Sequence, residues 1–244
     1  MPKRIKFFIV HLTLSLLLVL IIVGFILFFW YPSPLSSAVG VTQIIVMLSL
    51  IDVILGPLLG LLVYKEGKKS LNFDLSIIIF IQVFALCYGI YTIEQGRPVW
   101  LVYNVDRLEV IRKNELIEDN IENAPKQFQQ PSWFKPQFVG AEFAHDKKQR
   151  SDDMFIEVFS GISIAQKPER YVDLQEVKTK MQQKALTLNE LEKYNLQQDV
   201  KRLLSKNPKA NAWLPLKASA VDMVVLINKE SAEVIKIVDL RPWD

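Results

Sequence analysis

Apolar residues are concentrated in three long runs near the start of the chain. The first run, residues 7–31, contains no formal charge, and as a helix it extends about 37 Å. That length covers the hydrocarbon core of a bilayer, which is roughly 30 Å thick. The runs at residues 43–64 and 75–93 also approach or reach spanning length. The pattern predicts a three-helix transmembrane region over residues 1–96.

A cleaved secretory signal is the alternative interpretation of the first run. Basic residues Lys3, Arg4 and Lys6 precede it, and residues 36–38 are small enough for a cleavage site. However, the apolar core of a signal peptide is typically about 7 to 15 residues long. The length of the run therefore favours a retained transmembrane helix, with cleavage as the open alternative.

The polar stretches between the runs differ in charge. Residues 32–42 carry none, whereas six basic residues lie before the first run or between the second and third: Lys3, Arg4, Lys6, Lys65, Lys68 and Lys69. Because Lys and Arg accumulate in cytoplasmic connections, we expect a cytoplasmic amino terminus. Three crossings then place residues 97–244 on the far side, in the periplasm if the membrane is a bacterial inner membrane.

From residue 97 onward the sequence has the pattern of a folded α+β domain. Alternating and β-branched segments predict four strands, at residues 100–111, 213–219, 221–227 and 233–240. Amphipathic periodicity predicts helices at residues 152–161 and 188–206, the second beginning with a Thr187–Glu190 capping box. The predicted fold is therefore a membrane protein with three transmembrane helices and an α+β extracytoplasmic domain, in which helices cover one face of a small antiparallel sheet.

A proline-rich stretch at residues 120–136 predicts a surface loop in this domain. Trp133 and Phe134 lie within it. The two rings are either a lid over the core of the domain or an exposed contact for a partner, and the sequence does not decide between these alternatives.

Composition supports the division into two regions. The chain holds 29 basic and 26 acidic residues, a net charge of +3. Only 6 of these basic and 4 of these acidic residues lie within residues 1–96. A charge so close to balance is not the clustered cationic surface that nucleic-acid binding needs, so we expect no nucleic-acid partner.

Residues that carry enzyme chemistry are sparse. Cys87 is the single cysteine, and it lies in the third apolar run. The two histidines are far apart and predicted on opposite sides of the membrane, His11 in the first apolar run and His145 in a charged loop. They therefore cannot form one metal site. Asp152 and Asp153 fall at a predicted helix start, where solvent and the helix dipole explain them. We expect no enzyme activity, no metal and no cofactor.

The second run contains an acidic residue and two glycines on one helix face. Asp52, Gly56 and Gly60 are spaced i, i+4 and i+8, with Ser49 one turn earlier. We call these four residues the small-residue stripe. Pro57 lacks a backbone donor and predicts a kink or loosened turn beside it.

A polar residue of the third run lies at a depth similar to that of the acid. This residue, Gln82, is expected to hydrogen bond to Asp52. A charged residue at mid-membrane costs about 2.5 to 3.5 kcal/mol, which the apolar residues around it offset.

Three roles for Asp52 remain open from the sequence. It could fix the packing of the second and third helices, contact a separate transmembrane partner, or take part in proton conduction. Conduction is the weakest of the three because no relay of further acids accompanies it. The candidate partner-binding site in the membrane comprises Ser49, Asp52, Gly56, Pro57, Gly60 and Gln82.

Several short motifs follow one another along the chain. They are Tyr31-Pro32, residues 52–58, Asp74-Leu75, Gln82, Tyr88-Gly89, Arg97-Pro98, Asp106-Arg107 and Arg241-Pro242-Trp243. In order and spacing they resemble the TfpX/TfpZ family of type IV pilin accessory proteins. The resemblance covers about residues 31–111 and, more weakly, the last strand, whereas residues 125–210 do not share it.

The resemblance implies a function. Members of that family are inner-membrane proteins that are associated with particular pilins. The resemblance therefore implies a chaperone-like accessory protein that binds the major type IV pilin and assists pilin stability, pilus assembly or pilus dynamics. Other pilus assembly proteins are further candidate partners. It also marks a membrane-proximal motif: Asp74, Arg97, Pro98, Asp106 and Arg107.

The stripe and the periplasmic domain together suggest how a pilin would be held. We expect the small-residue stripe to receive the pilin helix while the periplasmic domain contacts the pilin head. The alternative is a membrane-anchored periplasmic ligand-binding or sensor module. The short cytoplasmic segments argue against this alternative because they are too small to carry a signalling output.

Overall fold

A computed structural model describes residues 1–243. The chain forms two compact units. The first, which we call the helical unit, consists of Met1–Trp30 and Val41–Gly96. The second, which we call the sheet domain, consists of Tyr31–Gly40 and the residues from Arg97 onward.

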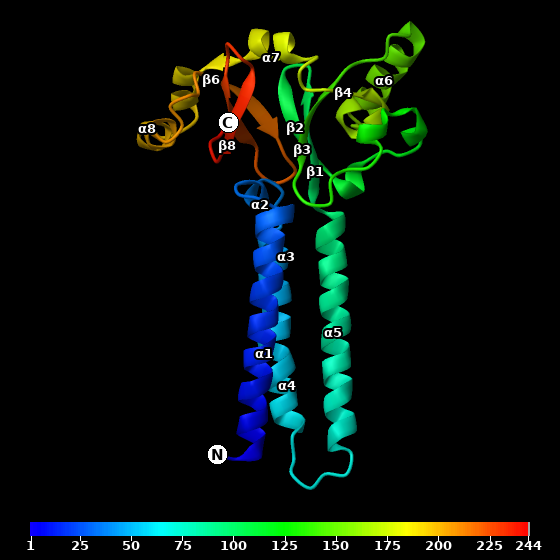
Figure 1. The fold of residues 1–244 in the computed structure, drawn as a ribbon, viewed down its shortest axis with the longest axis vertical. Helices are drawn as coiled ribbons and strands as arrows, with labels where there is room; N and C mark the ends of the chain where they lie inside the picture. Colours follow the sequence, from blue (N-terminus) through cyan, green and yellow to red (C-terminus); the bar gives the residue numbers. More distant parts are fainter. Residues whose placement is uncertain (244) are drawn as a thin grey trace. The chain divides into compact units, whose positions relative to one another are not determined.

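The helical unit contains three helices that are long and apolar enough to cross a membrane (Figure 1). They extend over Lys3–Trp30, Thr42–Val63 and Leu71–Gln95. Each bound lies within four residues of the bound of the apolar run that predicted it. The first comprises α1 (Lys3–Phe25) and the π-helical turn η1 (Ile26–Trp30). The second comprises α3 (Thr42–Leu50), the π-helical turn η2 (Ile51–Leu55) and α4 (Gly56–Val63), and the third is α5 (Leu71–Gln95).

The widened turn η2 lies directly before Pro57. Pro57 has no backbone N–H, and its ring crowds the carbonyl four residues earlier, which an α-helix cannot accommodate without adjustment. Gly56 N–H donates to the carbonyl of Ile51, the five-residue step of a π-helix. The loosened turn expected at this position is therefore present.

The sheet domain is built on an eight-stranded mixed sheet. Its strands are β1 (Pro98–Asn104), β2 (Arg107–Arg112), β3 (Gln137–Ala141), β4 (Tyr171–Val172), β5 (Leu186–Thr187), β6 (Ala212–Lys217), β7 (Met223–Asn228) and β8 (Glu233–Val238). The strand order is β4-β3-β1-β2-β6-β7-β8, and β5 pairs with β6. The pairs β1–β3 and β2–β6 are parallel. The sheet curls into a half-barrel, so the small antiparallel sheet predicted from the sequence is wrong.

Both faces of the sheet are covered, which also corrects the expectation of helices on one face only. The inner face carries one continuous apolar core with residues from β1, β2, β6 and β7. Helix α7 (Lys178–Lys184) contributes Met181 to this core. The opposite face carries two separate apolar clusters, one that includes Trp100 and Tyr171 and one that includes Trp213 and Leu191.

Residues 31–40, which connect the first two long helices in sequence, are part of the core of the sheet domain. They include the short helix α2 (Leu35–Ala38), and both Leu35 and Ala38 are fully buried in the inner-face core. The carbonyl of Ala38 accepts hydrogen bonds from the N–H groups of Ala220 and Val221, both at 3.0 Å. Figure 1 shows α2 and α7 at opposite ends of the sheet. The inner face is thus filled from both ends.

The strand predicted at residues 100–111 is in fact the hairpin β1–β2. The chain reverses at Val105 and Asp106, where Val105 has a φ of 58°, and Tyr103 Oη donates to the Val105 carbonyl at 2.9 Å. A β-branched residue rarely adopts a positive φ, which is why Val105 was not recognised as a turn position. Burial raises the pKa of Tyr103 to about 12, so its hydroxyl remains a donor at all physiological pH values.

The remaining predicted elements are largely present with shifted bounds. The last three strands correspond to β6, β7 and β8. The first predicted helix is α6 (Lys147–Ser160), which begins earlier because Asp146 caps Gln149 N–H at 2.9 Å. The second is divided into a 3₁₀ segment, η8 (Leu188–Lys193), and α8 (Gln197–Ser205). The Thr187–Glu190 capping box is present at the start of η8.

Short 3₁₀ turns occupy the other connections of the domain. They are η3 (Lys113–Glu115), η4 (Ile121–Asn123), η5 (Lys126–Phe128), η6 (Ile164–Gln166) and η7 (Pro168–Arg170). Two of them, η4 and η5, lie in the predicted loop at residues 120–136, which otherwise has no helix or strand before β3.

Candidate functional site

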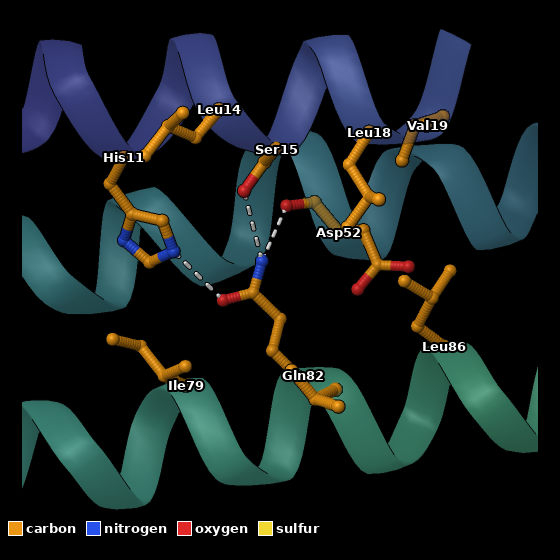
Figure 2. Close-up of a pocket in the computed structure, with 10 residues that line it drawn as sticks. His11, Leu14, Ser15, Leu18, Val19, Asp52, Ile79, Gln82 and Leu86 are labelled. Atoms are coloured by element: carbon orange, nitrogen blue, oxygen red, sulfur yellow. Dashed lines mark hydrogen bonds between the residues drawn. The ribbon is translucent and has the colours of Figure 1, made fainter. Parts of the chain in front are cut away.

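The side chain of Gln82 joins all three long helices. Its Nε2 donates to the backbone oxygen of Asp52 at 2.7 Å and lies 3.4 Å from Ser15 Oγ, and its Oε1 lies 3.1 Å from His11 Nε2 (Figure 2). A backbone oxygen can only accept, so this contact fixes the orientation of the amide and makes His11 Nε2 the donor to Oε1. The predicted hydrogen bond between Gln82 and Asp52 is present, but it ends on the Asp52 backbone and not on its carboxylate.

The two glycines of the small-residue stripe face the chain's own helices. A methyl group at Gly56 would overlap the Gln82 side-chain amide, and one at Gly60 would lie 3.0 Å from Phe7 Cε1. Asp52, Gly56, Pro57 and Gly60 are all buried. The stripe therefore lies inside the three-helix packing, and a pilin helix at this surface would have to displace α1 or α5.

Ser49, the fourth residue of the stripe, uses its hydroxyl within its own helix. Its Oγ donates to the carbonyl of Ile45 at 2.7 Å. A hydroxyl engaged in this way is weakly available to a partner. The structure therefore brings Asp52, Gly56 and Gln82 together and leaves Ser49 outside the group.

A cleft opens between α1 and α5, and the second helix forms its floor (Figure 2). Both α1 and α5 pack principally on the second helix. The cleft has a volume of about 230 Å³. Four polar residues line it: His11, Ser15, Asp52 and Gln82. The other lining residues are apolar: Leu14, Leu18, Val19, Ile79, Val83 and Leu86.

The apolar rim of the cleft is not covered by the chain. Leu14 is 62% exposed and Val83 is 51% exposed. We call this feature the α1–α5 cleft. Because its rim is open and apolar, a hydrocarbon chain or an apolar helix can enter it from the side.

Two buried polar atoms at the cleft have no hydrogen-bond partner among residues 1–243. They are Oδ2 of Asp52 and Nδ1 of His11. Figure 2 shows the Asp52 carboxylate and the His11 ring directed into the space between α1 and α5. In an apolar environment an unpaired polar atom costs about 1–3 kcal/mol, so a polar group that entered the cleft and paired with either atom would be stabilised.

The residues of the predicted membrane-proximal motif have structural contacts of their own. Asp74 Oδ2 pairs with Lys68 Nζ at 2.7 Å and accepts from Ser70 Oγ at 3.0 Å near the start of α5. Arg97 is buried, and its Nη1 donates to the Ser132 carbonyl at 2.8 Å. Pro98 begins β1.

The other motif residues hold the carboxyl end of the chain. Arg107 pairs with Asp106 at 2.8 Å, which raises the pKa of the guanidinium, and lies 5.6 Å from the Trp243 ring centroid. Trp243 Nε1 donates to Asp222 Oδ2 at 2.8 Å, and Arg241 donates to the Asp222 carbonyl. Motifs that are far apart in sequence therefore meet at one end of the sheet.

Helix α6 is tied to the sheet domain by a buried ion-pair group. Asp153 is 4% exposed, and its carboxylate pairs with Lys167 Nζ at 2.7 Å and Arg170 Nε at 2.8 Å. The interpretation of Asp153 as a solvated helix-start residue is therefore wrong, whereas Asp152 is exposed as expected. Because α6 begins earlier than predicted, Asp153 lies in the middle of the helix and not in its first turn, on the face that meets Lys167 and Arg170.

The opposite face of α6 presents large apolar side chains to solvent. Val158 is 79% exposed and Phe159 is 72% exposed. Met154 and Phe155 are exposed beside them, and the Phe155 and Phe159 rings lie 4.2 Å apart. Contiguous exposed apolar patches of this kind are typical of interaction surfaces.

Trp133 and Phe134 are half-exposed at the surface of the domain. They are 54% and 50% exposed, and their rings contact each other edge to face with centroids 5.3 Å apart. The rings therefore lie at the surface of the domain, and the choice between a lid and a partner contact stays a prediction.

No metal site is evident in the described part of the chain. Among residues 1–243, no group of three or more His, Cys, Asp and Glu side chains is arranged to hold a metal ion.

Comparison with known proteins gives three relatives from Dichelobacter nodosus. The fimbrial assembly protein of serogroup I is 31% identical over 233 residues, covering 90% of this chain and 89% of that protein. The fimbrial assembly protein of serogroup E1 is 30% identical over 230 residues, with the same coverage. The fimbrial assembly protein of serogroups C1 and C2 is 36% identical over 117 residues, covering 47% of this chain and 89% of that protein.

The chain belongs to this family of fimbrial assembly proteins. No protein-family model matches it, and no solved structure matches it significantly. Membership of this family agrees with the general direction of the sequence resemblance, and the narrower assignment to the TfpX/TfpZ family stays a prediction.

Several residues of the site were missed by sequence reasoning. His11 is too far from Gln82 in sequence for spacing to relate them, although both are polar residues inside apolar runs. Gly89 was noted only as part of a motif, yet a methyl group there would overlap Leu48 where α5 packs on α3. A general rule, that small residues mark close helix contacts in membranes, would have identified Gly89.

We predict that Gly56→Ala destabilises the helical unit, because the added methyl displaces the Gln82 amide from its hydrogen bonds. Gly24→Ala is the matched control, since Gly24 also lies in a long helix but has open space around it. Thermal unfolding of the full chain in mild detergent should show a lower midpoint for Gly56→Ala and an equal or higher one for Gly24→Ala. Equal midpoints for wild type and Gly56→Ala would contradict the Gln82 junction.

A second pair of variants tests the attachment of α6. Asp153→Ala leaves the buried Lys167 without its carboxylate, and removing one partner of a buried pair costs about 3–5 kcal/mol. We expect hydrogen exchange in residues 147–160 to become much faster in Asp153→Ala and to stay near wild type in Asp152→Ala. Similar exchange in both variants would show that the ion pairs do not hold the helix.

Proposed function

We propose that this protein is an inner-membrane accessory protein of type IV pilus biogenesis that binds pilin within the bilayer and assists its stability, its assembly or pilus dynamics. Membership of the fimbrial assembly family supports the biological process. The observation that supports the binding mode is the α1–α5 cleft, an apolar opening between two of the three long helices with unpaired polar atoms at its floor and wall.

The chemistry of a membrane-inserted pilin suits this cleft. A pilin exposes a long apolar helix with an acidic residue near its start, and its globular head projects from the membrane. The apolar walls formed by Leu14, Leu18 and Val83 suit such a helix. With Nε2 of His11 donating to Gln82, Nδ1 of a neutral ring accepts a hydrogen bond from a protonated carboxyl.

This proposal changes the place of the pilin helix relative to the sequence-based expectation. The glycines of the stripe are already covered by α1 and α5, so binding there would have to break existing contacts. Entry into the α1–α5 cleft breaks none of them. Asp52 belongs to both places, because it lies in the stripe and its Oδ2 faces the cleft.

A cytoplasmic amino terminus and a periplasmic sheet domain are part of the proposal. The basic residues before α1 and between α4 and α5 support this orientation. The sheet domain would then share a compartment with the pilin head. The exposed apolar face of α6 is one surface on which the head could rest, and two linked contacts bind more tightly than either alone.

A bulky residue in the cleft tests the proposal. We expect Leu18→Trp to fill the cleft and to reduce both the pilin that copurifies from mild detergent and the number of surface pili several-fold. Ile21→Trp is the control, because Ile21 lies on the same helix, is 71% exposed and does not line the cleft. Equal losses in both variants, or no loss in Leu18→Trp, would contradict pilin binding in the cleft.

A further inference from the structure

The half-barrel of the sheet domain has an open seam. At one side, β8 pairs with β7, and no other strand of residues 1–243 pairs with it. At the other side, β3 pairs with β1 along Gln137–Gly140 and with β4 at Gly140 and Ala141 alone. The outer edge of β8 therefore keeps backbone N–H and C=O groups that no sheet ladder satisfies.

An apolar groove lies along this seam, with a volume of about 240 Å³. Residues from both lips line it, together with part of the connector 31–40: Pro32, Ser33, Leu35, Leu101, Lys135, Pro136, Phe138, Val234, Ile235, Lys236 and Ile237. Phe138, Val234 and Ile237 pack against the inner-face core but are themselves only partly buried. The core is thus left uncovered where one more strand would complete it.

These two observations define the occupant. An extended segment satisfies the free edge of β8 through backbone hydrogen bonds, and its alternate side chains cover Phe138, Val234 and Ile237. Lys236 lies on the β8 side of the groove, which favours an acidic residue beside the apolar positions of the occupant. We propose that this seam binds one extended, acid-containing segment of the pilin head as an added strand on β8.

A second copy of the chain fits the seam poorly. Two β8 strands paired about a two-fold axis would bring Lys236 of one copy close to Lys236 of the other, because Lys236 lies near the middle of the strand. Like charges on directly neighbouring strands are destabilising. The occupant is therefore a different protein, and this inference rests on the proposed function for its choice of pilin.

Hydrogen exchange measures the added strand directly. The full chain in mild detergent is compared with and without purified pilin, and exchange is followed in peptides that cover residues 233–238. We expect exchange of alternate amides there to slow at least tenfold with pilin. Lys236→Glu, an exposed substitution that leaves the core intact, should remove most of this protection. The matched charge reversal Lys201→Glu, which is exposed on α8 and does not line the groove, should leave it unchanged.

The contrary outcomes are distinct. Slowed exchange in residues 11–19 and 79–86 without any change in β8 would leave pilin binding in the cleft intact and overturn the added strand. Protection at residues 147–160 instead of β8 would assign the head contact to α6. Protection that rises with the concentration of the chain alone would assign the seam to a second copy. Absence of any pilin-dependent change would overturn both proposals.

Discussion

A single side-chain amide in an apolar environment determines how the three long helices are arranged. Gln82 on α5 donates to the Asp52 backbone and lies within reach of Ser15 and His11 on α1. Lipid offers no replacement for these bonds, so their loss would leave several polar atoms unpaired. The arrangement requires a glycine at position 56, because any side chain there would occupy the space of the amide.

The α1–α5 cleft is a consequence of this arrangement. The Gln82 amide reaches across from α5 to α1, and both helices pack on the second helix more than on each other. The space beside the amide stays open, bounded by apolar side chains and by two polar atoms that the junction leaves unpaired. The polar group that holds the bundle together therefore also leaves the opening in which we propose that a pilin helix binds. The sheet domain also has an apolar opening, because its inner face is filled at both ends but open along the seam between β3 and β8.

The sequence predicted those features that depend on local composition. Long apolar runs predict spanning helices from length alone, Pro57 predicts a disturbed turn, and alternation predicts β6, β7 and β8. The Gln82–Asp52 contact was predictable because both residues are polar, buried in apolar runs and similar in depth. These inferences succeed because each follows from a property of a short segment.

Features that depend on distant pairing could not be predicted in the same way. The turn between β1 and β2 is hidden because Val105 takes a positive φ that valine disfavours. The parallel pairing of β1 with β3 and of β2 with β6 joins segments separated by long insertions, so no local pattern reports it. The uncharged connector 31–40 reads as a simple loop, yet Leu35 and Ala38 complete the core of a domain that begins at residue 97. The small-residue stripe was recognisable in the sequence, but no local pattern indicated that α1 and α5 pack against it.

The most direct test of the central claim is disulfide mapping in native membranes between the α1–α5 cleft and the pilin helix. A cysteine replaces Leu18 in a Cys87→Ser background, and single cysteines are placed along the apolar helix of pilin. The account predicts disulfides at pilin positions spaced three or four residues apart, and far fewer from a cysteine at Ile21. Disulfides formed equally from both positions, or from neither, would contradict a pilin helix in the cleft.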